Sequence, residues 1–307
     1  MKSILLHIGT HKTGSTSIQK FLDRASEQLR EDGVLYPEAG RPDDRVPHGH
    51  HLLAWSIQQK RGLKNLEGWE EVTSEIRRTP CSQIVLSSEV FADCSVEQIR
   101  HVCSFFPNAE VRVLVFLREL FSYMASVYKQ HVRAWGESRS FREFAESKMH
   151  LCDYQSLLDR WRKGGQIEQV VVRSFEKCCR SAGLEAALLD LLDIDPNRYA
   201  AYVQGPANVS PENYQVAAVR RINRLQERFG AGFLEDSGLL MDRSFMHRVK
   251  RQIIRGTRPG RLLAQLLTTT LADPLFADDD REWFSNRLQK KWSPPEPVAE
   301  VIDASSR

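Results

Sequence analysis

A glycine- and hydroxyl-rich segment near the start of the chain carries the residues best suited to chemistry. It spans residues 9–17 and reads Gly-Thr-His-Lys-Thr-Gly-Ser-Thr-Ser. The apolar run before it, residues 4–8, is rich in strand formers, and apolar residues at helical spacing follow it. A strand, a glycine-rich turn and a helix in this order form an anion site, because the backbone N–H groups and the dipole at a helix N-terminus attract negative charge.

The position of the lysine indicates which anion this loop suits. Loops that bind nucleoside triphosphates place a lysine directly after the second glycine of Gly-x-x-x-x-Gly. Gly9 and Gly14 have that spacing, but Ser15 stands in the place of the lysine, and Lys12 lies two residues before Gly14. The arrangement favours a shorter anion, with the positive charge near the middle of the loop. The plain alternative is an ordinary strand–turn–helix with a solvated lysine.

A second segment ends in an arginine at the same edge of the expected sheet. The apolar run 111–117 is typical of a buried parallel strand, Arg118 follows it, and Ser126 lies eight residues later on an expected helix. Ligands of open α/β sheets bind outside the carboxyl ends of the strands, so we expect Arg118 on the same rim as the first loop. A forked arginine and a serine hydroxyl can together bind a phosphate. A strand-capping arginine and a solvated serine are the alternative.

Over about residues 1–180, these motifs resemble those of the sulfotransferases that use 3′-phosphoadenosine 5′-phosphosulfate (PAPS). The resemblance implies an α/β, P-loop-like fold in which a parallel sheet is flanked by helices. It implies that Arg118 and Ser126 bind the 3′-phosphate and that Phe175 lies near the adenine, although a core aromatic is an equal alternative for Phe175. The residues similar to the 5′-phosphosulfate loop are Lys12, Thr13, Gly14, Ser15, Thr16 and Ser17.

The resemblance also implies the reaction, an in-line transfer of a sulfuryl group from PAPS to an acceptor hydroxyl without a required metal. Lys12 would stabilise the leaving oxygen, and a general base would take the proton of the hydroxyl. Glu89, at the end of the strand expected over residues 83–88, is one candidate base, although small-molecule members of the family carry a histidine there. His51 is the second, with His50 beside it, and a helix-capping or solvated histidine is the alternative for His51.

The acceptor is expected to be a saccharide or glycan. Two rival functions remain open from the sequence. One is a small-molecule kinase of the P-loop type that uses ATP and Mg²⁺, and the other is a protein that binds the product PAP without catalysis.

Composition sets outer limits on these functions. With 41% hydrophobic and 27% charged residues among 307, the chain has the composition of a soluble globular protein, and a net charge of +3 does not point to nucleic acid. No apolar run approaches the roughly 20 residues of a transmembrane helix, so we expect a cytoplasmic protein. Animal Golgi members of the family that the chain resembles carry an N-terminal membrane anchor, so the resemblance implies a bacterial enzyme. The six cysteines have no metal-ligand spacing, which predicts free thiols and no structural metal.

Two regions differ in pattern. Residues 1–204 alternate between strand and helix patterns and are expected to form the PAPS-binding core. Residues 205–307 are mainly helical and are expected to complete the core or the acceptor site, with a mobile tail from about 293. The basic stretch 243–261 suits a solvated helix face, an acidic glycan, peripheral contact with an anionic membrane, or part of the 3′-phosphate site. The oligomeric state is not indicated.

Overall fold

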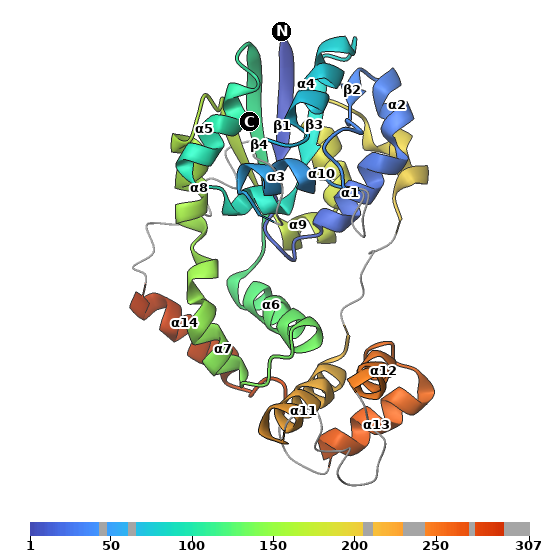
Figure 1. The fold of residues 1–307 in the computed structure, drawn as a ribbon, viewed down its shortest axis with the longest axis vertical. Coiled ribbons are helices and arrows are strands. Elements are labelled where there is room, and N and C mark those ends of the chain that lie inside the picture. Colours follow the sequence, from blue (N-terminus) through green and yellow to red (C-terminus); the bar gives the residue numbers. More distant parts are fainter. Residues whose placement is uncertain (43–47, 61–65, 205–210, 230–242, 270–273, 292–307) are drawn as a thin grey trace. The chain divides into compact units, whose positions relative to one another are not determined.

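The computed structural model describes residues 1–42, 48–60, 66–204, 211–229, 243–269 and 274–291, which form two compact units (Figure 1). The first unit holds the described residues of 1–119 and 153–204, and the second those of 120–152 and 211–291. The second unit therefore draws on residues from both sides of the boundary expected at residue 205. The tail expected from about residue 293 lies outside the described residues.

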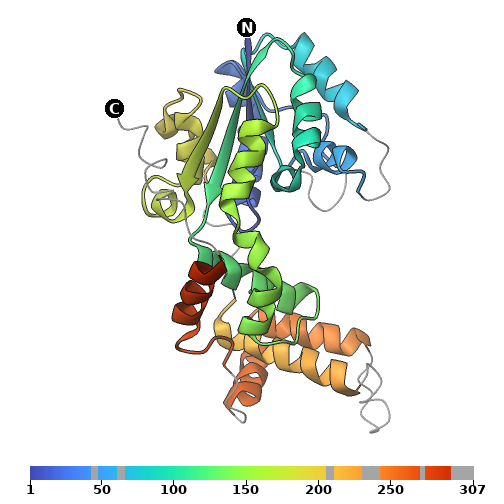
Figure 2. The ribbon, with the colours of Figure 1, turned by 90° about the vertical axis from the view of Figure 1, so that its left-hand side faces the viewer.

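The sheet of the first unit has five parallel strands in the order β2-β3-β1-β4-β5. Each pair of parallel strands needs a crossover connection, and helices supply these connections along the chain. Figures 1 and 2 show helices on both faces of the sheet, so the expected α/β class with a flanked parallel sheet is confirmed. The strands are β1 (Lys2–His7), β2 (Val34–Leu35), β3 (Gln83–Ser87), β4 (Ala109–Leu117) and β5 (Gln169–Ser174).

The helices of the first unit largely follow the apolar periodicity. The pattern predicts one helix over residues 16–31, but the structure has two, because Ala25 leaves helical geometry at φ −91° and ψ 5°. The α-helices are α1 (Ser15–Arg24), α2 (Ser26–Glu31), α3 (His51–Ile57), α4 (Trp69–Arg78), α5 (Val96–Ser104), α8 (Tyr154–Lys163), α9 (Phe175–Arg180) and α10 (Leu184–Asp190). Two 3₁₀ helices, η1 (Glu89–Asp93) and η3 (Pro196–Tyr202), complete the described part of this unit.

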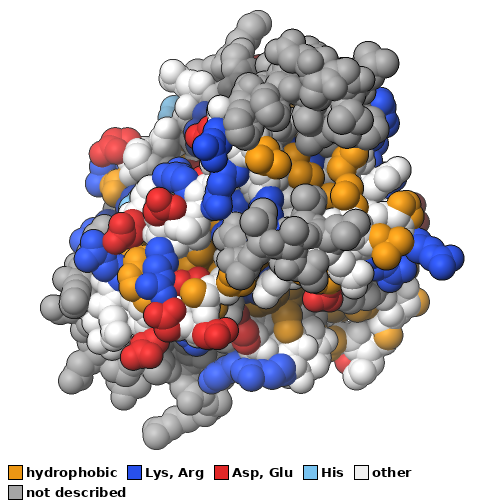
Figure 3. All heavy atoms as spheres, turned by 90° about the horizontal axis from the view of Figure 1, so that it is seen from below, with side chains coloured by type: hydrophobic (Ala, Val, Ile, Leu, Met, Phe, Trp, Pro, Cys, Tyr) orange, Lys and Arg blue, Asp and Glu red, His pale blue; other side chains and the backbone are white. Residues whose placement is uncertain are grey.

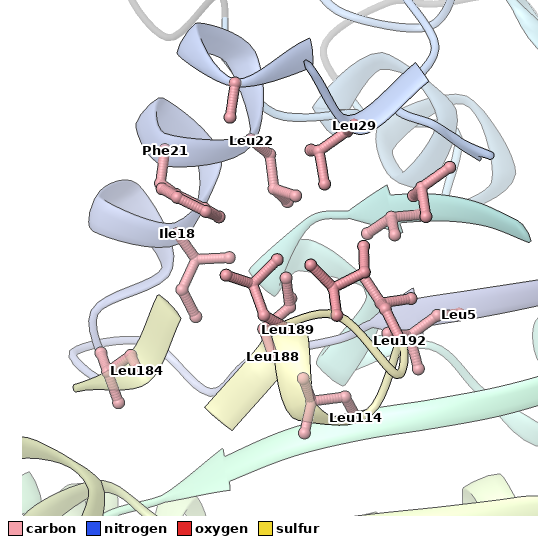
Figure 4. Packing of buried hydrophobic residues seen from close by; sticks show 14 of the residues in the cluster. Leu5, Ile18, Phe21, Leu22, Leu29, Leu114, Leu184, Leu188, Leu189 and Leu192 are labelled. Carbon is pink, nitrogen blue, oxygen red and sulfur yellow. The ribbon is translucent and has the colours of Figure 1, made fainter. Parts of the chain in front are cut away.

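Alternate strand residues form the core on one face of the sheet. Leu5 and Leu114 face α1 and α10, whose leucines pack against them (Figure 4). Ile4 and Leu6, which point to the opposite face, are also fully buried. The sheet is therefore covered on both faces, which explains why its strands read as continuous apolar runs. The rigid sheet fixes the positions of the loops at its carboxyl edge.

The second unit is helical and has an aromatic core. The rings of Phe141 and Phe276 lie 5.1 Å apart, and those of Tyr128 and Phe144 lie 5.2 Å apart. Arg220 is buried here and donates from Nη1 to the Tyr128 hydroxyl at 3.0 Å. The elements are α6 (Leu120–Ala134), α7 (Phe141–Lys148), the 3₁₀ helix η2 (Met149–Cys152), α11 (Asn213–Phe229), α12 (Arg243–Ile254), α13 (Arg258–Thr269) and α14 (Asp280–Lys291).

The basic stretch 243–261 lies in this second unit. The pattern predicts one helix over residues 245–271, and the structure divides it into α12 and α13 around Gly256, whose φ is +63°. Figure 3 shows positive, negative and apolar side chains intermixed on the coloured part of the face seen from below. Lys250 of this stretch donates to Oε1 of Gln226 at 2.6 Å. The role of the stretch stays a prediction.

Three further findings bear on function. All six cysteines are free thiols, five of them buried and Cys179 exposed. Within the described ranges, no helix is both long and apolar enough to cross a membrane. Within the same ranges, no three His, Cys, Asp or Glu side chains are placed to hold a metal ion.

Candidate active site

The loop between β1 and α1 is tightly wound. Gly9, Lys12 and Gly14 all have positive φ angles, of 38°, 67° and 80°. A β-carbon on Gly14 would lie 2.3 Å from Cδ1 of Leu184, so both the backbone angle and the space require glycine there. Lys12 is a non-glycine residue in the left-handed region, a conformation that costs free energy and that the surrounding contacts must stabilise.

The start of α1 has the features of an anion site. Gly14 is the N-cap and brings no side chain to the first turn, which holds no acidic residue. The buried hydroxyl of Ser15 has no hydrogen-bond partner among the residues that the structure describes. An unpartnered buried hydroxyl is rare, and a ligand or a water molecule at the loop would satisfy it. The helix dipole favours a negative ligand at the same place.

Two of the other hydroxyls predicted to bind phosphate already have internal partners. The buried Thr13 hydroxyl donates to the carbonyl oxygen of Thr10 at 2.6 Å, so Thr13 can offer a ligand its backbone N–H but not its hydroxyl. The Ser17 hydroxyl donates to Oε1 of the buried Glu185 at 2.7 Å. Thr16 is half-buried. A ligand at this loop would therefore find the Ser15 hydroxyl and backbone N–H groups available, whereas the hydroxyl protons of Thr13 and Ser17 are already engaged.

Arg118 directly follows β4 and contacts the loop. Its Nη1 donates to the carbonyl oxygen of Lys12 at 3.2 Å, and its Nε lies 3.7 Å from Oε1 of Glu176. The guanidinium carbon is 5.1 Å from the centre of the Phe175 ring. The same ring would lie 3.4 Å from a β-carbon on Gly14. The structure thus brings together Arg118, Phe175 and the loop around Lys12 and Gly14, which the sequence predicts as parts of one cofactor site.

Ser126 lies in the second unit, half-buried on α6. Its pairing with Arg118 at a 3′-phosphate stays a prediction.

The two candidate bases form one pair. Glu89 follows β3 as the first residue of η1, and its Oε2 lies 3.9 Å from Nε2 of His51. The Gln19 amide of α1 donates to the same carboxylate oxygen at 3.0 Å, and His51 Nδ1 shares a 2.8 Å hydrogen bond with the Ser88 hydroxyl. The His51 side chain is 3% exposed and that of Glu89 is 21% exposed, so the carboxylate is the more accessible member. The sequence leaves these residues as alternatives, whereas the structure places them in contact.

The electrostatics of the pair keep Glu89 ionised. Burial raises the pKa of Glu89, but the opposing effects of His51, the backbone N–H, the Gln19 amide and His11 outweigh burial and lower the pKa below its usual value. Glu89 is therefore a carboxylate at neutral pH, ready to accept a proton.

His50, the neighbour of His51, is committed to the fold. Its Nε2 donates to the carbonyl oxygen of Pro37 at 3.0 Å, and its Nδ1 accepts from the N–H of Ser87 at 3.1 Å. With both ring nitrogens engaged, His50 has no lone pair left for an acceptor proton. Burial is the main reason that its pKa falls to about 3.

Several residues of the site are not evident from the sequence. His7, at the end of β1, shares a 2.8 Å hydrogen bond with the Ser87 hydroxyl, and its buried Nε2 has no hydrogen-bond partner among the described residues. A β-carbon on Gly9 would lie 3.5 Å from this nitrogen and 2.5 Å from the Ser15 hydroxyl. The sequence does contain one sign of these residues, which is a polar side chain at a position where an apolar one is expected. His7 interrupts the apolar run 4–8, and Gln19 lies beside Ile18 on the buried face of α1.

Comparisons with known proteins find distant structural likenesses. No protein-family model and no curated protein matches the chain. A sulfotransferase from Alicyclobacillus acidocaldarius is 16% identical with a TM-score of 0.44, and the match covers 80% of this chain and 96% of that one. The sulfotransferase domain from the curacin biosynthetic pathway is 12% identical with a TM-score of 0.40, covering 94% and 98%. At this distance, function has to be inferred from the residues of the site.

Acid should destabilise the protein through its buried histidines. Burial lowers the pKa of His7 to about 4 and that of His50 to about 3, whereas in the unfolded chain both take up a proton near the ordinary pKa of about 6.5. Because the unfolded state then binds more protons, the free energy of unfolding should fall as the pH drops from about 6.5 to 4. Each histidine contributes a slope of up to about 1.4 kcal/mol per pH unit. Urea unfolding at stepped pH measures this slope.

The variant His7→Asn provides the control for this prediction. Asparagine can keep a hydrogen bond to Ser87 but does not titrate, so the slope between pH 6 and 4 should fall by roughly half. A variant with the slope of the natural protein would show that His7 does not cause it.

Proposed function

We propose that this protein transfers a sulfuryl group from PAPS to a hydroxyl group of an acceptor, a saccharide. The proposal rests on one observation above all. Lys12 occupies the middle of a wound loop between Gly9 and Gly14, while Ser15 stands where a triphosphate loop has its lysine. Arg118 and Phe175 lie beside this loop, which matches the needs of an adenine nucleotide that ends in a short anion.

The residues present fit the donor. The start of α1, with its dipole and the unpartnered Ser15 hydroxyl, suits the 5′ end of the nucleotide. The Arg118 guanidinium suits the 3′-phosphate, with Ser126 as a second ligand, and the flat ring of Phe175 suits the adenine. The residues that would hold the 5′ end are Lys12, Thr13, Gly14, Ser15, Thr16 and Ser17.

The chain's own residues have distinct tasks in this reaction. PAPS, when bound, supplies a sulfuryl group that is open to attack by a hydroxyl. Lys12 places positive charge where negative charge develops on the leaving side. The Glu89–His51 pair accepts the proton of the acceptor hydroxyl, and Gln19 orients the Glu89 carboxylate through its amide. Ser88 holds the imidazole of His51 through its hydrogen bond to Nδ1.

The first test is a comparison of nucleotides. PAP should bind with a micromolar Kd in the presence of excess chelator, because the site depends on N–H groups, Lys12 and Arg118 rather than on a metal. Isothermal titration calorimetry with PAP and with ATP plus Mg²⁺ measures both. Binding of ATP with Mg²⁺ and no binding of PAP would contradict the proposal and favour a kinase. Binding of PAP without transfer from PAPS to any acceptor would favour a non-catalytic protein.

Variants of Arg118 serve as the control for this test. Arg118→Lys keeps the charge but loses the planar fork, so PAP should bind roughly 10- to 150-fold more weakly, as expected for about 1.5–3 kcal/mol of charge-assisted hydrogen bonding. The affinity for adenosine 5′-phosphosulfate, which has no 3′-phosphate, should fall much less in the same variant. Equal losses for both ligands would mean that Arg118 acts through its bond to the Lys12 carbonyl.

The base pair can be tested by a double-mutant cycle. Glu89→Gln should lower turnover by roughly 10²- to 10⁴-fold while leaving the affinity for PAP nearly unchanged, and His51→Asn should lower turnover less. Because the two side chains act on one proton, the double variant should be hardly slower than Glu89→Gln alone. If the loss of turnover in the double variant equals the product of the two single losses, Glu89 and His51 have independent roles. Near-normal turnover in both single variants would contradict the assignment.

The pH profile of kcat/KM distinguishes the two members of the pair. With Glu89 as the proton acceptor, the ascending limb should lie below the usual carboxylate pKa, because the pKa of Glu89 is lowered. A limb near the ordinary histidine value of about 6.5 would instead assign the proton to His51.

A further inference from the structure

A cavity of about 500 Å³ lies in the second unit, apart from any residue assigned above. One wall is the turn after α6, residues 135–139, and the other is α11, through Asn223, Gln226 and Glu227. Its volume falls within the range of about 300–1,000 Å³ that is usual for small-molecule sites. All of its lining residues belong to one compact unit, so the cavity is a property of that unit alone.

Trp135 gives this cavity an aromatic wall. Its side chain is 65% exposed, which is unusual for so large an apolar group. The ring nevertheless has a neighbour, because the His131 ring packs edge-on against it with 4.1 Å between the ring centres. The backbone N–H of Trp135 donates to the His131 carbonyl oxygen at 3.0 Å, which holds the main chain at this position. The next residue, Gly136, has a φ of +76°, and a β-carbon there would meet no atom within 4 Å. Open space therefore adjoins a flat indole.

The polar groups around the indole are fixed. The Asn223 amide donates to the carbonyl oxygens of Val132 and Glu137, both at 2.8 Å, which orients the side chain. Asn223 is 4% exposed, and its Oδ1 is a buried acceptor with no hydrogen-bond partner among the described residues. Gln226 accepts from Lys250 through Oε1, so this side chain brings its N–H groups to the cavity. The wall thus offers donors from Gln226, and the exposed carboxylate of Glu227 is an acceptor.

The charged residues that line the cavity are two carboxylates, Glu137 and Glu227, and one guanidinium, Arg139. Arg139 donates to both oxygens of Glu137, from Nε at 2.9 Å and from Nη2 at 2.7 Å. Glu227 accepts a hydrogen bond from the Ser138 hydroxyl. With Arg139 neutralised by Glu137, the cavity has no excess positive charge to attract an acidic ligand.

We infer that the Trp135 cavity binds an uncharged sugar residue. One face of a pyranose ring carries C–H groups that stack on an indole, while its hydroxyl groups donate and accept hydrogen bonds at the rim. Trp135 supplies the stacking surface, and Gln226 and Glu227 supply the polar partners. The site would hold a neutral sugar unit of the acceptor glycan. This link to the acceptor rests on the proposed sulfuryl transfer, whereas the binding of sugar to the cavity does not.

The test uses the full chain without any nucleotide. Neutral tetrasaccharides of glucose, galactose and N-acetylglucosamine are titrated, with tryptophan fluorescence and saturation-transfer NMR as readouts. At least one should bind in the micromolar to millimolar range. Trp135→Ala should weaken it at least tenfold, Trp135→Tyr should weaken it less, and Gln226→Ala should weaken it several-fold. The matched control is Leu262→Ala, which removes another exposed apolar side chain of the same unit and should have no effect.

The outcomes separate this inference from the proposed reaction. Loss of sugar binding in Trp135→Ala with unchanged PAP binding supports the cavity whether or not sulfuryl transfer is found. Absence of binding by all three tetrasaccharides overturns the inference, and so does an equal loss in Leu262→Ala. Binding of sulfated or carboxylated glycans alone, or a change of oligomeric state without a change in sugar affinity, overturns it as well.

Discussion

The parallel pairing of β1 with β3 is the constraint on which the rest of the site depends. The register sets His7 level with Ser87, so the loop that follows β1 emerges beside the residue that follows β3. A β-carbon on Gly9 would therefore lie 3.5 Å from the β-carbon of Glu89. His50 extends the same edge, because its N–H donates to the carbonyl oxygen of Ser87 and its ring accepts from the Ser87 N–H. These bonds bring His51 to Glu89 from a different part of the chain.

Two buried histidines at this edge are neutral, whereas Glu89 is charged. His7 and His50 are neutral because burial lowers the pKa of each imidazole, and they serve the fold. Glu89 is only partly buried, and its environment favours the charged form chiefly through His51, the backbone N–H and Gln19. A carboxylate that its neighbours keep ionised, next to a loop with the features of an anion site, is consistent with a role in proton transfer.

The sequence predicts the local elements well and the contacts between them poorly. The strands β1, β3 and β4 follow from apolar runs, and the loop before α1 follows from Gly9 and Gly14. Boundaries that depend on tertiary contacts differ, as at Ala25, where one expected helix becomes two. The pairing of Glu89 with His51 could not be predicted, because it depends on the path of the chain from β2 to α3. The hydrogen bond from Ser17 to Glu185 joins positions 168 residues apart, so no local sequence pattern could predict it.

A crystal structure of the protein with PAP tests the central claim most directly, that the loop around Lys12 receives the 5′ end of the nucleotide. The account predicts the 5′-phosphate at the N-terminus of α1, within hydrogen-bond distance of backbone N–H groups of residues 13–17 and of the Ser15 hydroxyl, with the 3′-phosphate on Arg118. A nucleotide bound elsewhere, or one whose 5′-phosphate avoids the loop, would contradict the account.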